Sequence, residues 1–260
     1  MKFSEIKSCY IGPEVSPEQF IPEHFFLFLA KGKMDYFDGS KHYTLHPGEY
    51  CIVRKNNLAR YNKQKENNYF EKVIILFDET FLRSFEEKHS VIFNEFESKN
   101  AVFKLDKNFF IDNFIQSLQP YFEISGRIND SFSDLKREEL LLILLKQNPE
   151  LSGIFFDFNA PGKINLQEFM QKNYKFNVSI DRFAYLTGRS LSSFKKDFKE
   201  IFNDTPSHWL VKRRLEEAHF LMKEKLKKPN DIYIDLGFED LSHFSFAFKK
   251  QFGFSPSEVR

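Results

Sequence analysis

The chain has 260 residues, 42% of them apolar, which is enough to bury the cores of two domains. Its 38 basic and 37 acidic residues leave a net charge of +1, so the chain as a whole is not strongly cationic. Its two cysteines, Cys9 and Cys51, lack the spacing of a zinc or disulfide framework, so we expect two buried thiols.

Short apolar runs separated by turn residues dominate the first part of the chain. Asp38-Gly39-Ser40 and Pro47-Gly48 are typical turn sequences between such runs. Short strands with these turns indicate antiparallel hairpins that close into a small barrel or sandwich. The predicted strands are residues 25–29, 34–37, 43–45, 50–53 and 73–77.

Candidate metal ligands in this part are His24, His42 and His46, with Glu49 as an oxygen ligand. Two histidines on one strand share a face only when they are two residues apart. Three residues separate His42 from His46, so no metal site is predicted. Because paired catalytic carboxylates, a Gly-rich phosphate loop and a nucleophile elbow are also absent, we predict neither a cofactor nor a catalytic site.

From residue 79 to about residue 157 the apolar pattern becomes helical. Its clearest helix is the leucine-rich segment 134–147, with Ser133 or Asp134 as the N-cap and Pro149 after its end. Its apolar surface suits either a core or a subunit contact. The chain shows no signal-like segment and no apolar run near the roughly 20 residues of a membrane span, so we expect a cytoplasmic protein.

Near the C-terminus one motif occurs twice at an offset of 50 residues. Its spacing Phe-x3-Phe-Lys-x2-Phe places three aromatic rings on one helical face. A Thr/Ser-Pro-Ser sequence then ends that helix and starts the next. The first copy and its repeat are Phe194, Phe198, Lys199, Phe202, Thr205, Pro206, Ser207 and Phe244, Phe248, Lys249, Phe252, Ser255, Pro256, Ser257.

A short predicted helix and a glycine turn precede each copy. Helix 179–186 is followed by Gly188, and helix 231–236 is followed by Gly237. Helix, glycine turn and helix form a helix-turn-helix (HTH) unit, whose second helix enters the DNA major groove. The amphipathic segment 207–226 between them predicts a helix of about 30 Å. This length is close to the roughly 34 Å between successive major grooves on one side of B-DNA, so one rigid helix is expected to hold the two HTH units one DNA turn apart.

Residues 164–260 resemble the DNA-binding domain of the AraC/XylS family of bacterial transcription regulators. The resemblance rests on Gly237-Phe238, the run from Phe244 to Gly253, Ser255-Pro256 and Arg260. It implies two HTH units joined by a linker helix, binding to double-stranded DNA, contact with RNA polymerase, and activation more often than repression. It also implies an N-terminal cupin-like sensor barrel, a homodimer, and control by a small molecule or a protein.

We therefore predict an α+β fold with three parts. Residues 1–157 form a cupin-like antiparallel β-barrel with helices for sensing and oligomerisation, residues 158–163 are a linker, and residues 164–260 are an all-α DNA-binding domain. The expected function is a sequence-specific transcription regulator, and not an enzyme. The alternative is a cupin-type small-molecule-binding protein or enzyme with a helical appendix.

The residues that face DNA are predicted by subtraction, since Leu191, Phe194 and Phe198 point inward. Ser192, Lys195 and Lys196 are the candidates for contact with base edges. Position 246, where the family commonly has arginine, holds a phenylalanine, which contacts a thymine methyl but bonds neither guanine nor phosphate. The predicted DNA-binding residues are Ser192, Ser193, Lys195, Lys196, Lys199, Ser242, His243, Ser245, Phe246 and Lys249.

Charge supports this placement. Residues 161–260 contain 18 basic and 13 acidic residues, an excess that favours several specific phosphate contacts. Arg213 and Arg214 of the predicted linker helix are expected either to pair with Glu216 and Glu217 or to contact phosphates.

Overall fold

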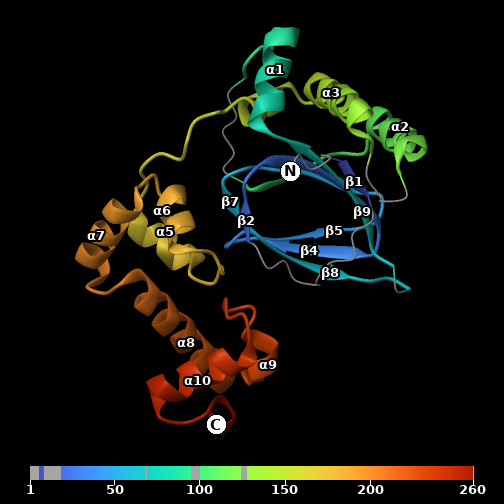
Figure 1. Cartoon of the computed structure of the whole chain (residues 1–260). Helices are drawn as coiled ribbons and strands as arrows, with labels where there is room; N and C mark the ends of the chain where they lie inside the picture. Colours follow the sequence, from blue (N-terminus) through green and yellow to red (C-terminus); the bar gives the residue numbers. More distant parts are fainter. Residues whose placement is uncertain (1–5, 9–18, 68, 95–99, 124–127, 260) are drawn as a thin grey trace. The chain divides into compact units, whose positions relative to one another are not determined.

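The computed structural model describes residues 6–8, 19–67, 69–94, 100–123 and 128–259 (Figure 1). The expectations for Cys9 and Arg260 lie outside these residues. The chain divides into an N-terminal unit of residues 1–16 and 21–159 and a C-terminal unit of residues 17–20 and 160–260. Both units together give the predicted α+β class. The strands belong to the first unit, and the described residues of the second unit from 160 onward form helices but no strand.

Two antiparallel sheets form the β part of the N-terminal unit. The five-stranded sheet has the order β1-β9-β3-β6-β10, the three-stranded sheet has the order β5-β4-β8, and β2 pairs with β7. All five predicted strands are confirmed, and the short or polar strands β1, β2, β7, β8 and β10 were not predicted. The strands are β1 (Ile6–Ser8), β2 (Phe20–Ile21), β3 (His24–Lys31), β4 (Lys33–Phe37), β5 (His42–Leu45), β6 (Tyr50–Val53), β7 (Asn57–Leu58), β8 (Arg60–Gln64), β9 (Glu71–Phe77) and β10 (Val102–Lys104).

The five-stranded sheet is buried on both faces. Successive side chains on a strand point to opposite faces, so β3 and β6 contribute to two cores. Leu27 and Cys51 pack with Met34 of the three-stranded sheet, and Phe26 and Ile52 pack against the helices. Cys51 is a buried thiol, as predicted.

The helical layer comprises α1 (Glu79–His89), α2 (Phe109–Ser117), α3 (Asp130–Gln147) and α4 (Ser152–Phe155). The predicted start of the leucine-rich helix was wrong. Asn129 is the N-cap of α3, because its side chain accepts a hydrogen bond from the amide of Ser131. Leu140, Leu141 and Leu144 are fully buried in the core.

His24 is a core residue. It is 1% exposed, and burial lowers the pKa of its imidazole to about 3, so the ring is neutral. Its Nδ1 accepts a hydrogen bond of 3.3 Å from the amide of Lys55. Within the described residues, no group of three or more His, Cys, Asp or Glu side chains is arranged to hold a metal ion.

The C-terminal unit contains α5 (Leu166–Asn173), α6 (Ile180–Leu186), α7 (Leu191–Phe202), α8 (Pro206–Lys225), α9 (Pro229–Ile232) and α10 (Leu241–Phe252). The predicted helices around α6 and α8 are confirmed. The predicted helix 231–236 is wrong: α9 starts at Pro229 and ends at Ile232, and residues 233–237 form a turn. Across the described ranges, no helix combines the length and apolar content that crossing a membrane requires.

Candidate nucleic-acid interface

The first HTH unit consists of α6, the turn 187–190 and α7. Both helices begin at serine caps: Ser179 Oγ accepts the amide of Arg182 at 3.3 Å, and Ser190 Oγ accepts the amide of Ser193 at 3.2 Å. Phe194 of α7 is fully buried, as the repeat predicts. The outer face of α7 therefore has a fixed direction relative to the turn.

The turn of this unit requires glycine at position 188. Gly188 has a φ of +66°, and a Cβ there would lie 2.3 Å from the carbonyl carbon of Gly162. The Thr187 hydroxyl donates to the carbonyls of Phe183 and Ala184 at 2.9 and 3.0 Å. The chain that leads into α5 is thus packed directly on the HTH turn.

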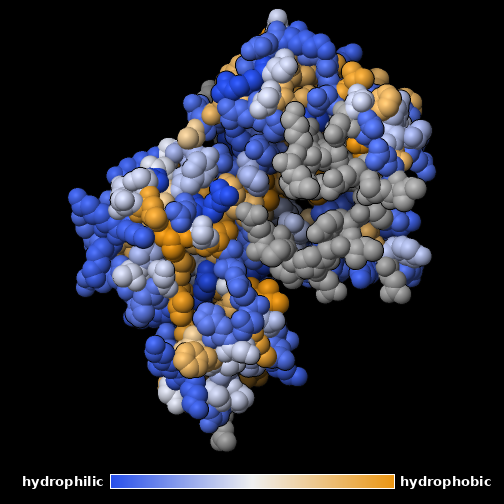
Figure 2. Space-filling view, viewed as in Figure 1, coloured by the Kyte–Doolittle hydropathy of each residue, from blue (hydrophilic) through white to orange (hydrophobic). Residues whose placement is uncertain are grey.

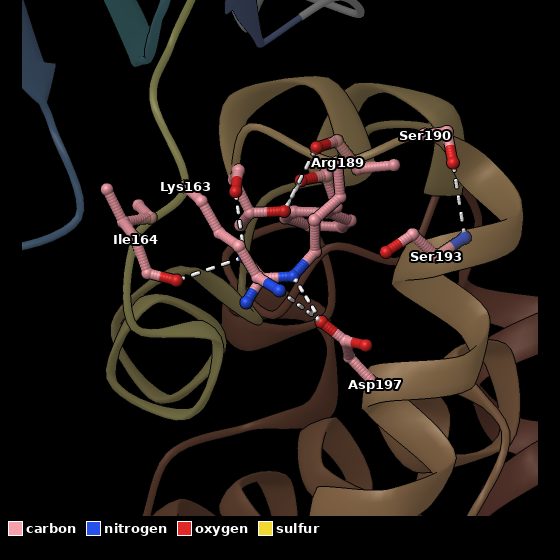
Figure 3. A network of polar contacts seen from close by, with 9 residues as sticks. Lys163, Ile164, Arg189, Ser190, Ser193 and Asp197 are labelled. Atoms are coloured by element: carbon pink, nitrogen blue, oxygen red, sulfur yellow. Dashed lines mark hydrogen bonds and ion pairs between the residues drawn. The ribbon is translucent and has the colours of Figure 1, made fainter.

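Arg189 ties this turn to α7 (Figure 3). Its Nε donates to Asp197 Oδ2 at 2.9 Å, and its Nη1 donates to the carbonyls of Ile164 at 3.0 Å and Thr187 at 2.7 Å. Lys163 Nζ lies 3.4 Å from the same carboxylate oxygen. The hydrogen bond from Arg189, followed by that from Lys163, lowers the pKa of Asp197. Sequence reasoning missed this network, although an arginine inside an HTH turn was a visible signal.

The second HTH unit consists of α9, the turn 233–240 and α10. Asp240 caps α10 by accepting the amide of His243 at 2.6 Å. Gly237 has a φ of +85°, and a Cβ there would lie 2.7 Å from the carbonyl oxygen of Lys175. Phe244 and Phe248 are fully buried, so the repeated motif has the same structural role in both units.

Helix α8 packs against both HTH units (Figure 1). Trp209 near its start lies 5.6 Å from the ring of Phe198 and 4.7 Å from that of Phe202, measured between centroids. Leu215, Ala218 and Met222 farther along pack into the aromatic cluster of the second unit. The helix is therefore part of two cores, as its predicted linking role requires.

The predicted DNA-facing residues lie on the outer faces of α7 and α10. Lys195 and Lys196 are exposed, and their side chains form no hydrogen bond or ion pair with a described residue. Figure 2 shows hydrophilic side chains over the edge where Figure 1 places α7. Phe246 is 71% exposed, which is unusual for a phenylalanine. Ser192, Lys199, Ser242, His243 and Lys249 are also exposed, whereas Ser193 and Ser245 are half-buried.

Arg214 does not have the partners predicted for it. It is 8% exposed, and its guanidinium bonds three backbone carbonyls, so it neither pairs with Glu216 or Glu217 nor reaches phosphate. Glu217 instead accepts from Lys175 at 2.9 Å. Arg213 comes within 3.8 Å of Glu216, as one of the two alternatives predicted.

Comparison with known proteins adds to this geometry. Residues 24–154 match the profile of the ExsA N-terminal regulatory domain, and residues 183–260 match that of a helix-turn-helix domain. The chain is 28% identical to the virulence regulon transcriptional activator VirF of Yersinia enterocolitica, over 89% of this chain and 87% of VirF. It is 23% identical to the HTH-type transcriptional regulator ExsA of Pseudomonas aeruginosa, over 98% of this chain and 92% of ExsA.

Among solved structures, a ToxT variant from Vibrio cholerae aligns with 97% of this chain and 94% of its own, at 14% identity and a TM-score of 0.45. The ExsA-type profile alone spans half of this chain. VirF and ExsA, which align with most of this chain, are transcription regulators. This sets aside the alternative of a cupin-type small-molecule-binding protein or enzyme with a helical appendix. The chain belongs to the AraC/XylS family of DNA-binding transcription regulators and carries the ExsA type of N-terminal regulatory domain.

Proposed function

We propose that this regulator activates transcription by placing α7 and α10 in successive major grooves on one face of a promoter. The observation that carries the proposal is the pair of HTH units built around the single helix α8, each with exposed lysines on its outer face. The name of its relative VirF supports activation rather than repression. Contact with RNA polymerase from this promoter-bound position is part of the same proposal.

In this arrangement the first HTH unit supplies most of the base and phosphate contacts. Lys195, Lys196 and Ser192 reach base edges from the first turns of α7, and Lys199 contacts phosphate. In the second unit, Ser242 and His243 lie near the groove and Phe246 contacts thymine methyl groups. The second unit therefore selects A/T-rich sequence with less discrimination. Ser193, Ser245 and Lys249 complete the proposed interface.

Binding of the full chain to duplexes that it selects from a random-sequence pool tests this interface. Lys195→Ala and Lys196→Ala should each weaken binding by about 1–3 kcal/mol where a base contact is lost, and relax the preference at that base pair. Lys172→Ala, which removes an exposed lysine from α5, is the matched control. Unchanged affinity and unchanged sequence preference in both α7 variants would contradict the proposal.

A cavity between the two sheets supports control by a small molecule. It has a volume of about 80 Å³ and a mainly apolar lining that includes Leu27, Met34, Tyr36 and Cys51, with Lys104 at its edge. The buried Tyr36 hydroxyl forms no hydrogen bond within the described part of the chain, so it is free to bond a ligand. The fitting class is a small, largely apolar molecule with one hydrogen-bond acceptor.

Phenol is a suitable probe for this cavity. Saturating phenol should raise the melting temperature of the wild-type chain, and Tyr36→Phe should reduce that increase because it removes the buried donor. Leu226→Ala, at an exposed position of the C-terminal unit, serves as the control variant. No increase with phenol in the wild type would count against this cavity as a binding site for molecules of that class.

The outer face of α3 supports the proposed homodimer. Phe132, Leu135 and Leu142 are 45%, 61% and 44% exposed and are spaced three and seven residues apart, so they share one face. Such an apolar stripe suits the same stripe of a second copy. Sedimentation equilibrium should give a dimer for the wild type and for Leu226→Glu, and a monomer for the double variant Leu135→Glu, Leu142→Glu. A dimer that survives the double variant would exclude this face.

A further inference from the structure

Arg214 lies at the middle of α8 and connects the segment that precedes the first HTH unit to the turn of the second. Its Nε donates to the carbonyl of Tyr174 at 2.7 Å, and its Nη2 donates to that of Phe176 at 2.8 Å. Both carbonyls belong to the segment that joins α5 to α6, beside the first unit. Its Nη1 donates to the carbonyl of Gly237 at 2.9 Å, in the turn of the second unit. One side chain thus bonds backbone carbonyls of a segment that precedes α8 in the chain and of a turn that follows it.

The surroundings of Arg214 leave little room for another arrangement. A Cβ at Gly237 would lie 2.9 Å from the guanidinium carbon, so the turn backbone is packed directly on this side chain. Two contacts flank it: Lys175 Nζ pairs with Glu217 at 2.9 Å, and Asn177 Nδ2 donates to Glu239 Oε1 at 3.0 Å. The segment 174–177 therefore contacts both α8 and the second turn.

A guanidinium is well suited to fixing an orientation. Its donors lie in one plane and point in set directions, so three simultaneous bonds determine rotation as well as distance. Burial strengthens these bonds because water does not compete for the carbonyls. Burial also lowers the pKa of Arg214 to about 10, which still leaves the group charged at neutral pH. The aromatic contacts of α8 are less directional than these bonds.

We propose that Arg214 is a positioning residue that sets the orientation of the second HTH unit relative to the first, and thereby the spacing of DNA boxes that the chain accepts. This inference rests on the proposed binding of both units to one DNA face. Because B-DNA turns once in about 10.5 base pairs, each added base pair rotates the second box by about 34°. A rigid pair of HTH units will lose affinity for the rotated site, whereas a loosely joined pair will adjust and keep its affinity.

The test measures how the affinity of the full chain depends on box spacing. The probes are the two-box duplex that the wild type selects from a random pool, the same duplex with two base pairs inserted between the boxes, and a duplex with the first box alone. We expect the wild type to lose at least about tenfold in affinity on insertion, because the second unit no longer adds to the first. Arg214→Lys, which keeps the charge but loses the fork, should lose most of this spacing preference and keep single-box binding within about twofold.

Arg213→Lys is the matched control, because it makes the same exchange at the next position, where the side chain lies 3.8 Å from Glu216. It should behave as the wild type. Retention of the full spacing preference in Arg214→Lys would overturn the inference, as would selection of a single box by the wild type. If circular dichroism shows that Arg214→Lys is unfolded, Arg214→Gln, which keeps one amide donor group but loses the guanidinium, decides: a reduced spacing preference supports the inference, and an unchanged one overturns it. Failure of the wild type to bind any DNA would instead reject the proposed function.

Discussion

The two HTH units share a frame and differ in chemistry. In both, a glycine of positive φ lies in the turn, and two phenylalanines of the following helix are fully buried. Helix α7 begins at the neutral cap Ser190 and exposes three lysines. Helix α10 begins at the acidic cap Asp240, exposes Phe246 at the position of Lys196, and exposes two lysines near its end. The repeated aromatic residues therefore determine where each helix lies, and the outward residues determine what each helix is able to bind.

The two turns also differ in the partners of their charged residues. Arg189 in the first turn bonds Asp197 of the helix that follows it, while Glu239 in the second turn accepts from Asn177 outside its own unit. An acidic cap stabilises the start of a helix through the helix dipole, but it repels an approaching phosphate. The first turn is thus bonded to its own following helix as well as to Ile164, whereas Glu239 of the second turn bonds a residue outside its unit.

Removing a core ring tests the shared frame and should have the largest effect. Phe198→Ala and Phe248→Ala should each lower the free energy of unfolding of the C-terminal unit by about 3–5 kcal/mol, because each leaves a cavity in a packed aromatic cluster. Urea unfolding followed by the fluorescence of Trp209, the single tryptophan, measures both. A loss below about 1 kcal/mol in either variant would break the structural equivalence of the two units.

Removing the brace of the first turn should have an intermediate effect. Arg189→Ala deletes a side chain that is 6% exposed and removes its hydrogen bonds to two carbonyls and to the Asp197 carboxylate, which should lower the free energy of unfolding by about 1–3 kcal/mol. Glu239→Ala, in the second turn, removes one exposed hydrogen bond and should lower the free energy of unfolding by less than about 1 kcal/mol. The same urea titration compares them, and equal costs would show that the first turn is not specially braced.

Outward residues of α7 and α10 should contribute differently to DNA binding. Lys199→Ala should reduce the slope of log affinity against log salt by about 0.9, because the proposed interface gives this lysine one phosphate contact. Phe246→Ala should weaken DNA binding by about 1 kcal/mol, the scale of one methyl contact, and leave the salt slope unchanged. Affinities at several salt concentrations, with the duplex selected by the wild type, give both values. A smaller slope in the Phe246 variant would remove the proposed division of roles.

Acid should weaken the first unit slightly by a route that the second unit lacks. The pKa of Asp197 is held below its ordinary 3.8, mainly by the hydrogen bond from Arg189. The pair therefore contributes fully above about pH 4 and is lost as pH falls through the lower folded-state pKa. The stability difference between the wild type and Asp197→Asn should be constant from about pH 7 to 5 and shrink below about pH 4. An unchanged difference at about pH 3 would show that the carboxylate is not held by Arg189.

Elements with strong periodicity were predictable from the sequence. The repeat indicated α7 and α10, since aromatic residues at helical spacing have few other uses, and the amphipathic segment 207–226 indicated α8 to within one residue at each end. Strand β8, with the sequence Arg-Tyr-Asn-Lys-Gln, was missed because its side chains are polar and its pairing with β4 decides its conformation. The end of α9 was misplaced for a similar reason, because residues 233–237 look helical until the close approach of Gly237 to Lys175 is known.

The candidate interface also has features that the sequence predicted and features that it did not. The exposure of Lys195, Lys196 and Phe246 followed from the helical period alone, because burying one face of an amphipathic helix exposes the other. The roles of Arg189 and Arg214 did not follow, since both residues bond carbonyl groups, which every residue possesses and which therefore leave no trace in a sequence pattern.

The sequence by itself determined two HTH units, the helix that joins them and the residues turned toward solvent, because these depend on local spacing and on the side chains themselves. Only the tertiary structure decided how the units are held together. Arg214 meets the carbonyls of Tyr174, Phe176 and Gly237, which are separated from it by 23 to 40 positions in the chain. Such contacts form only when the chain has folded, and they place a buried charge where the sequence pattern indicated a surface residue.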